Sequence, residues 1–263
     1  MDMQLQGTRA FVSGSTQGIG YAIARGLAAE GAHVTVNGRE APRVDATVAR
    51  LRAEVPGATI AGLAADLAVD ADVRQLVPAL GEVDILVNNV GEFGLRDFTD
   101  LSDDDWRRSL DVNLMSGVRL SRAALPGMLA RGTGRILFVG TESALDVPAD
   151  MVHYGVAKAG ALALANGLAK LTRGTAVTVN TILGGPTYSD GVASTVRELA
   201  EAQGMTEQDL QAAIMGQRTT SVLGRFIRPE ELAALAVYLA SPLSSATNGA
   251  AVRAEGGVLT TTT

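Results

Sequence analysis

The sequence predicts a single α/β domain built on a parallel sheet that helices cover on both faces. Short apolar runs of strand length alternate with helical patterns along the whole chain, and this order is typical of parallel sheets. A length of 263 residues suits one domain with a large core. With 47% hydrophobic and 19% charged residues, the composition is that of a folded globular protein.

Seven apolar runs predict strands, and five longer segments predict helices. The predicted strands are Arg9–Ser13, Val34–Asn37, Ile60–Ala65, Ile85–Asn88, Arg135–Val139, Val177–Ile182 and Ala250–Arg253. The predicted helices are Ile19–Glu30, Arg43–Glu54, Ser102–Arg131, Met151–Leu171 and Pro229–Ala240. Ser102 and Asp105 have the spacing of a capping box, and Pro229 suits a first helical turn. No repeat or linker interrupts the pattern, so we predict one domain over residues 1–263.

The polar segment Tyr188–Thr220 breaks the alternation of strands and helices. Its pattern predicts short helices, with Thr206 and Asp209 placed to cap the second of them. An insertion of this length usually covers a nearby ligand site. We therefore predict a substrate lid over residues 188–220, with a simple surface excursion as the alternative.

Composition and charge exclude several classes of partner. The net charge is −6 and no basic stripe is present, which argues against nucleic acid. The chain has no cysteine and two histidines, so we expect no disulfide, no thiolate chemistry and no metal site. The polar N-terminus and the absence of an apolar run of ~18 residues predict a cytoplasmic protein with no membrane partner.

A glycine-rich turn follows the first predicted strand and opens a helix. Its glycines have the spacing G-x-x-x-G-x-G. Glycines allow a tight turn and let the backbone approach a pyrophosphate at the positive end of a helix. This turn predicts a Rossmann-type, doubly wound sheet that binds a dinucleotide. The predicted contacts in the turn are Gly14, Ser15, Thr16, Gln17, Gly18, Ile19 and Gly20.

The end of the second predicted strand favours NADP(H) over NAD(H). An acid about 20 residues after the turn would bond the ribose hydroxyls of NAD. Here that position holds Gly38, followed by Arg39. An arginine fork suits a phosphate dianion, so we predict that Arg39 contacts the 2′-phosphate. Arg39 could instead be a solvated surface charge. Arg43 either adds to the positive potential around the 2′-phosphate or lies on an exposed helix face.

Tyr154 and Lys158 are four residues apart in a predicted helix and so share one face. A tyrosine titrates near ~10, and an ammonium at ~4 Å contributes ~4 kcal/mol at an effective dielectric of 20. That energy would bring the pKa of the phenol near ~7, where general acid–base catalysis works best. The alternative is that Tyr154 and Lys158 are two helix residues with no joint role.

Further motifs complete a pattern that resembles one family. They are Asp66-Leu67, Asn88-Asn89-Val90-Gly91, Asp111-Val112-Asn113-Leu114, Asn180 to Gly185 and Ala254-Glu255-Gly256-Gly257. Together with the glycine turn and the Tyr154–Lys158 pair, they make the chain similar to short-chain dehydrogenases/reductases over essentially its full length. Within this family, the sequence most resembles the 3-oxoacyl-carrier-protein-reductase-like branch.

The resemblance implies roles for these residues. It implies further cofactor contacts at Asp66, Leu67, Asn88, Val90, Gly91, Tyr154, Lys158, Thr187 and Ser189. Asp66 would bond the adenine edge, and Gly91 would allow close approach of the nucleotide. Lys158 would hold the nicotinamide ribose and lower the pKa of Tyr154, while Asn113 would bind a water in a proton relay. Asp66 could instead cap a turn, and Asn113 could be a hydrogen bonder inside a helix.

Three positions depart from the family pattern. The catalytic serine of the family, thirteen residues before the tyrosine, is replaced by Thr141, and Ser143 lies two residues later. Either hydroxyl could polarise a carbonyl, and the spacing favours Thr141. Gly184 stands where the family has proline, which should free the backbone beside the nicotinamide. Glu255 replaces an aspartate, a mild change.

The predicted function is hydride transfer between NADP(H) and a carbonyl or alcohol substrate, with Tyr154 as general acid/base. The alternative is a catalytically weak nucleotide-binding protein that regulates a partner, suggested by the altered serine position. Phe93, after the Asn-Asn-Val-Gly turn, could touch substrate.

Many small residues on the helix after Met151 favour a close helix–helix interface. Family resemblance implies a homotetramer of dihedral symmetry, with helix propensity of alanine as the alternative explanation and a dimer as the alternative assembly. We expect a bulky charge at Ala165 or Ala169 to dissociate the oligomer.

Overall fold

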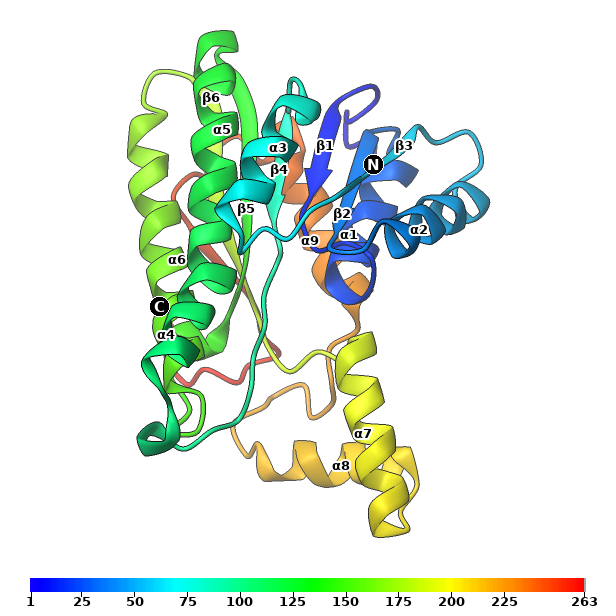
Figure 1. The fold of residues 1–263 in the computed structure, drawn as a ribbon, viewed down its shortest axis with the longest axis vertical. Helices are drawn as coiled ribbons and strands as arrows, with labels where there is room; N and C mark the ends of the chain where they lie inside the picture. The colour runs from blue at the N-terminus through cyan, green and yellow to red at the C-terminus, as the bar shows by residue number, and fades with distance from the viewer. Residues whose placement is uncertain (263) are drawn as a thin grey trace.

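The computed structural model describes residues 1–262, which form a seven-stranded, fully parallel sheet (Figure 1). The strands are β1 Arg9–Val12, β2 His33–Gly38, β3 Ile60–Ala64, β4 Ile85–Asn88, β5 Thr133–Thr141, β6 Ala176–Gly184 and β7 Ala251–Ala254. Their order is β3-β2-β1-β4-β5-β6-β7. The order therefore reverses between β1 and β4, and ligands bind at such switch points, beyond the carboxyl ends of the strands. The predicted doubly wound Rossmann-type fold is confirmed.

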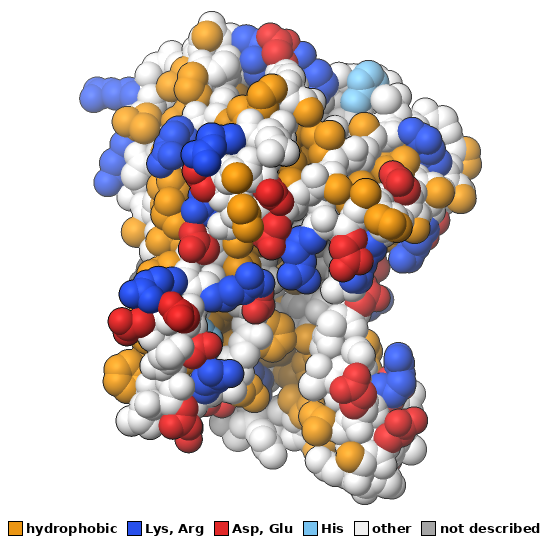
Figure 2. All heavy atoms as spheres, viewed as in Figure 1, with side chains coloured by type: hydrophobic (Ala, Val, Ile, Leu, Met, Phe, Trp, Pro, Cys, Tyr) orange, Lys and Arg blue, Asp and Glu red, His pale blue; other side chains and the backbone are white. Residues whose placement is uncertain are grey.

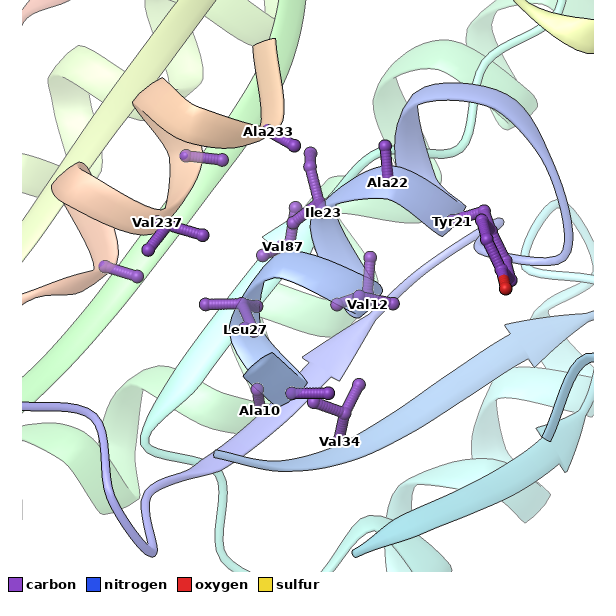
Figure 3. Packing of buried hydrophobic residues seen from close by; sticks show 14 of the residues in the cluster. Ala10, Val12, Tyr21, Ala22, Ile23, Leu27, Val34, Val87, Ala233 and Val237 are labelled. Atoms are coloured by element: carbon purple, nitrogen blue, oxygen red, sulfur yellow. The ribbon is translucent and has the colours of Figure 1, made fainter. Parts of the chain in front are cut away.

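Helices cover both faces of the sheet (Figure 1). One face carries α1 Gly18–Ala29, α2 Ala41–Glu54 and α9 Pro229–Ala240, and the other carries α3 Asp70–Leu80, α5 Ser116–Arg131 and α6 Val152–Leu171. Figure 3 shows the first layer, where Val12, Val34 and Val87 of the strands meet residues of α1 and α9. A Cβ on Gly26 would lie 3.0 Å from Val237, so the small residue lets α1 and α9 pack closely. This packing fixes α1 on the sheet, with its first residue, Gly18, shortly after the carboxyl end of β1.

The predicted helix over Ser102–Arg131 is interrupted. The expected capping box is present, because Asp105 N donates to Ser102 Oγ at 3.2 Å and Ser102 N donates to Asp105 Oδ2 at 3.0 Å. The helix α4 Asp103–Leu110 then gives way to a π turn at Asp111–Met115 before α5 begins. Such turns occur frequently at functional sites, and this one holds Asn113. The helix α3 was not predicted; it is short and contains Pro78.

The segment after β6 folds into α7 Asp190–Gln203 and α8 Glu207–Gln217. As predicted, Thr206 caps α8 by accepting a hydrogen bond from Asp209 N at 3.1 Å. The two helices pack around a small cluster of their own and project from the body, at the lower right of Figure 1. Figure 2, drawn from the same side, shows a recess between this unit and the rest of the molecule, with hydrophobic side chains on its walls.

Residues 1–262 contain neither a candidate membrane-spanning helix nor a candidate metal site. None of the helices in this range is long and apolar enough to span a membrane. Within the same residues, no group of three or more His, Asp or Glu side chains is arranged to hold a metal ion.

Candidate active site

The glycine turn between β1 and α1 is sterically closed to side chains. Gly14 and Gly18 have φ angles of +58° and +57°, in the left-handed region that favours glycine. A Cβ on Gly14 would lie 2.9 Å from a methyl of Val90, and one on Gly20 would lie 2.5 Å from the Gly14 carbonyl oxygen. The backbone therefore turns as tightly as the sequence pattern predicted.

Two asparagines that the sequence analysis did not select, the buried Asn37 and the half-buried Asn89, brace this turn. Asn37 Oδ1 accepts a hydrogen bond from Gly14 N at 3.2 Å. Asn89 Nδ2 donates to the carbonyl oxygens of Ser13 and Gly14 at 3.0 and 2.9 Å. Each asparagine lies at the carboxyl end of a strand, β2 or β4, where a polar residue follows a buried run. That position was the available signal.

The residues assigned to the adenosine side also have structural roles. Asp66 Oδ1 accepts from Ala68 N at 3.0 Å, so the alternative of a turn cap describes one of its oxygens. Leu67 is buried in the core. Asn88 Nδ2 donates to Ser121 Oγ at 3.2 Å, and within residues 1–262 its Oδ1 has no hydrogen-bond partner although it is buried.

The N-terminus of α1 already holds an anion. Gly18 N donates at 2.6 Å to the carboxylate of Asp190, the first residue of α7. Ser189 lies against the same turn, since a Cβ on Gly18 would be 3.3 Å from its Cβ. The first N–H groups of a helix have no partner inside the helix and lie at its positive end. The carboxylate thus shows that this end of α1 accepts a negatively charged oxygen.

The carboxyl end of β2 has no room for an acid. A Cβ on Gly38 would lie 2.6 Å from Thr16 Cγ2, so any side chain there would collide with the glycine turn. Arg39 is exposed, and no carboxylate of the described residues lies within 4.0 Å of its guanidinium. Arg43 donates a hydrogen bond to Gln17 Oε1. Arg43 lies on the exposed face of α2, as the alternative held, and its guanidinium also reaches the glycine turn.

Lys158 and Asn113 converge on Gly91, in the loop that follows β4. A Cβ on Gly91 would lie 3.0 Å from Lys158 Nζ and 3.2 Å from Asn113 Oδ1. Lys158 is buried, and its Nζ donates to the Val139 carbonyl oxygen at 3.1 Å. The same Nζ lies 5.8 Å from the centre of the Tyr154 ring, one helical turn earlier on α6.

The amide of Asn113 is fully engaged with the protein. Its Oδ1 accepts from Glu92 N at 3.0 Å, and its Nδ2 donates to the carbonyl oxygens of Glu92 and Ser109 at 2.9 and 3.1 Å. The alternative of a hydrogen bonder inside a helix therefore describes its side chain. The bonds to Glu92 also join the π turn to the loop that carries Gly91.

At the end of β5, the hydroxyl of Thr141 is bonded to a buried carboxylate. Thr141 Oγ1 donates to Glu142 Oε2 at 2.5 Å and accepts from Ser143 N at 3.2 Å. The Glu142 side chain is only 8% exposed, and its Oε1 lies 3.8 Å from Arg218 Nη1, just beyond α8. Ser143 is buried in the following 3₁₀ turn. The sequence analysis missed Glu142, although a carboxylate directly beside the expected hydroxyl was a signal.

The pKa of Tyr154 is shifted in the direction opposite to that predicted. Burial raises the pKa of the phenol, the negative charge of Glu142 raises it further, and a hydrogen bond with Thr141 partly offsets both. Burial also lowers the pKa of Lys158 to about 8. The prediction from helical spacing considered only the Lys158 ammonium, whereas the structure adds desolvation of the phenol and the carboxylate of Glu142. The prediction of a phenol pKa near neutrality is therefore wrong for this structure.

The backbone at the end of β6 is held rather than freed. Gly184 pairs with Thr141 on one side and Ala254 on the other, so the missing proline leaves no mobile segment. A Cβ on Gly185 would lie 2.3 Å from the Glu255 carbonyl oxygen. Thr187 Oγ1 donates to the Gly185 carbonyl oxygen at 2.9 Å, which fixes the start of the segment leading to α7.

Exposed apolar side chains lie against Tyr154 and against the residue that follows it. The Phe93 ring meets the Tyr154 ring edge to face, with centroids 6.2 Å apart, and Phe93 is 59% exposed. Leu145 and Val147 are also exposed, and Val147 lies over Gly155, where a Cβ would be 2.5 Å away. The polar cluster of Thr141, Glu142 and Tyr154 thus lies beside an exposed apolar surface.

Known proteins are similar to this chain in sequence and in fold. Residues 14–259 match the family model described as enoyl-(acyl carrier protein) reductase. The chain is 44% identical to the uncharacterized oxidoreductase YvaG of Bacillus subtilis, with 98% of each chain covered. It is 34% identical to the 3-oxoacyl-[acyl-carrier-protein] reductase FabG of Pseudomonas aeruginosa, with 97% of this chain and 99% of the other covered.

Among solved structures, the chain is similar to L-sorbose reductase from Gluconobacter frateurii, determined in complex with NADPH and L-sorbose. The TM-score is 0.94 at 31% identity, with 99% of this chain and 100% of the other covered. The chain therefore belongs to the short-chain dehydrogenase/reductase family, in the branch that contains the 3-oxoacyl-carrier-protein reductases. It is an NAD(P)-dependent oxidoreductase of that family.

Proposed function

We propose that this protein transfers hydride between NADP(H) and a small carbonyl or alcohol substrate, with Tyr154 as general acid/base. The observation that carries the proposal is the convergence of Lys158 and Asn113 on Gly91, one helical turn from Tyr154. Thr141 lies near enough to the same phenol to lower its pKa, so a second hydroxyl lies beside the proposed proton donor.

The residues present fit a dinucleotide. The glycine turn accepts no side chain at Gly14 or Gly20, and a carboxylate stands at the N-terminus of α1, where a diphosphate would bind. Val90 and Ser189 line the same turn. Asn88 Oδ1, buried and without a partner among residues 1–262, and the second oxygen of Asp66 are acceptors for the adenosine side. The nicotinamide, when bound, supplies or accepts the hydride.

In the reduction, the protein handles the proton and the developing negative charge. Tyr154 gives its proton to the carbonyl oxygen, and Thr141 hydrogen-bonds the same oxygen, as in an oxyanion hole. Lys158 orients the nicotinamide ribose and stabilises the phenolate with its buried charge. Asn113 holds the Gly91 loop, and the π turn around it is where a relay water would bind.

We further propose that α7 and α8 form a lid over residues 188–220. The unit has its own small apolar cluster, and two charged contacts join it to the body. Asp190 contacts the nucleotide-binding end of α1, and Arg218 contacts Glu142 beside Tyr154. A bound diphosphate would compete with Asp190 for Gly18 N, which couples the lid to the cofactor.

The competing proposal is a nucleotide-binding regulator with weak catalysis. The replacement of serine by threonine at position 141 favours it. The buried Lys158 and the engaged Thr141 hydroxyl beside Tyr154 oppose it, since a binding module needs neither. Both proposals expect NADPH to bind, and only the enzyme consumes it when a carbonyl compound is added.

The first test concerns the cofactor. We expect NADPH to be preferred over NADH, and Arg39→Asp to weaken NADPH binding by about tenfold or more, because a charge-assisted phosphate contact contributes about 1.5–3 kcal/mol. Fluorescence titration with both nucleotides measures the preference. Arg122→Asp, at an exposed position on α5, is the matched control and should change neither affinity. A wild type that prefers NADH would contradict the assignment.

The second test concerns assembly, which we propose to be a homotetramer. Ala165 is 2% exposed and packs in the core, so a charge there would unfold the protomer rather than dissociate a complex. The position for the test is Ala163, which is exposed on α6. We expect light scattering to give about four times 27.1 kDa for the wild type and a smaller mass for Ala163→Glu. A wild-type mass of one chain would rule out the interface.

A further inference from the structure

Glu142 is a buried carboxylate at the centre of the active site. It follows the last residue of β5, and its side chain is 8% exposed. Burying a carboxylate is costly unless it is paired or protonated. The charged and titratable groups that face it are Arg218 from beyond α8 and Tyr154 from α6. Its hydrogen-bonding partner is the hydroxyl of Thr141 at 2.5 Å.

A hydroxyl has a single proton to donate, and that of Thr141 is directed to Glu142. On its acceptor side, Thr141 Oγ1 receives the hydrogen bond from Ser143 N at 3.2 Å. While Glu142 is ionised it can only accept, so the Thr141 proton stays with the carboxylate. In that state Thr141 cannot donate to the carbonyl oxygen of a substrate.

Protonation of Glu142 reverses the hydrogen bond. A carboxylic acid carries an O–H donor, so Glu142 would then donate to Thr141 Oγ1. The Thr141 proton is released from the carboxylate and can be directed to the substrate oxygen. Only the direction of hydrogen bonds changes: Glu142 keeps its proton during turnover, and the proton consumed in reduction still comes from Tyr154.

We propose that Glu142 is a positioning residue that sets the direction of the Thr141 hydroxyl, and that the protonated form of Glu142 is the one competent for reduction. This inference rests on the proposed function. It concerns a residue outside the expected set of Asn113, Thr141, Tyr154 and Lys158.

The electrostatics of the site agree with this role. Burial raises the pKa of the Glu142 carboxyl, and the hydrogen bond from Thr141 and the charge of Arg218 oppose that shift. The negative charge of Glu142 raises the pKa of Tyr154, so protonating Glu142 also makes the phenol a better acid. Arg218 is 42% exposed and belongs to the proposed lid, so lid position influences the protonation of Glu142.

The test is the pH profile of kcat/KM for reduction in the wild type and in Glu142→Gln. The amide of glutamine donates to Thr141 at every pH, as the protonated acid does. We expect the wild-type value to fall as pH rises through the pKa of Glu142, and this fall to be absent in Glu142→Gln. Above that pKa the variant should exceed the wild type by about tenfold or more, since one oxyanion donor is worth about 10²-fold.

Two further variants keep the test specific. Thr141→Val has no hydroxyl to redirect, so its residual activity should fall less with pH than the wild-type activity, by only the part that the charge of Glu142 exerts on Tyr154. Asp146→Asn changes an exposed carboxylate four residues away and should retain the wild-type profile. A fall that persists in Glu142→Gln overturns the inference, and so does a full wild-type fall in Thr141→Val or a loss of about 10²-fold in Glu142→Gln at every pH.

Infrared spectroscopy gives a readout that does not depend on turnover. We expect the carbonyl band of a protonated carboxylic acid in the wild type at pH values where reduction is fast, and its loss in Glu142→Gln. Absence of the band overturns the role of Glu142 even if the enzyme is active. Absence of activity with the band present instead refutes the proposed function.

Discussion

Tyr154→Phe is expected to lower kcat for carbonyl reduction by about 10³-fold while NADPH affinity changes by no more than about threefold. The phenol is the only proposed proton donor, and general acid catalysis typically contributes about 10²–10⁴-fold. The phenylalanine ring preserves the edge-to-face contact with Phe93 and the packing of α6. Steady-state kinetics with NADPH and a ketone panel, beside a fluorescence titration of NADPH, measures both quantities.

The control for this prediction is Tyr238→Phe, which removes a hydroxyl from a 40% exposed residue of α9. It should leave kcat unchanged. A Tyr154→Phe variant that retains more than about a tenth of the wild-type kcat would show that another group supplies the proton.

At pH values where Glu142 is protonated, Thr141→Val is expected to lower kcat by about 10²-fold, with Thr141→Ser restoring most of the loss. Valine has nearly the shape of threonine but cannot donate to a developing oxyanion, and loss of one such donor costs about 10²–10³-fold. It also leaves Glu142 without its 2.5 Å hydrogen bond, so we expect a lower melting temperature for Thr141→Val. Kinetics and thermal unfolding of the same preparations separate the two effects.

Ser143→Ala is the comparison that assigns the hydroxyl. Ser143 lies in the 3₁₀ turn, and the hydroxyl next to the phenol is that of Thr141. We expect Ser143→Ala to change kcat by less than about threefold. The reverse pattern, with a large loss in Ser143→Ala and a small one in Thr141→Val, would transfer the role to Ser143.

The parts of the fold that the sequence predicts best are those with one dominant physical constraint. The central strands β4, β5 and β6 are buried along most of their length and appear as continuous apolar runs. All seven strands lie where they were expected, the more exposed edge strands β3 and β7 included. The sequence did not predict α3, because its interior Pro78 and its few buried residues weaken the helical pattern. The sequence did not predict the π turn at Asp111–Met115, because such a turn differs from an α-helix in its hydrogen bonding and not in its composition.

In the candidate site, too, the sequence predicts the features that have one dominant physical constraint and misses those that depend on tertiary contacts. The glycine turn was predictable because a positive φ and a closed Cβ position require glycine. The pKa of Tyr154 was not, because helical spacing places Lys158 on the same face but says nothing of burial or of Glu142. The surroundings of Glu142 include Arg218, which is far from it in the sequence, so the sequence does not show that this carboxylate is buried. The sequence also could not show which alanines of α6 face the core, because that helix carries small residues on every face.

A single-turnover experiment tests the central claim most directly. Wild-type protein in excess over NADPH is mixed with ketoses, β-keto esters or other small ketones, and the absorbance of NADPH is followed alongside that of Tyr154→Phe. We predict that at least one carbonyl compound oxidises the bound NADPH in the wild type, and that Tyr154→Phe binds NADPH equally well but oxidises it about 10³-fold more slowly. Equal rates in both proteins, or tight NADPH binding with no oxidation by any carbonyl compound, would contradict the account.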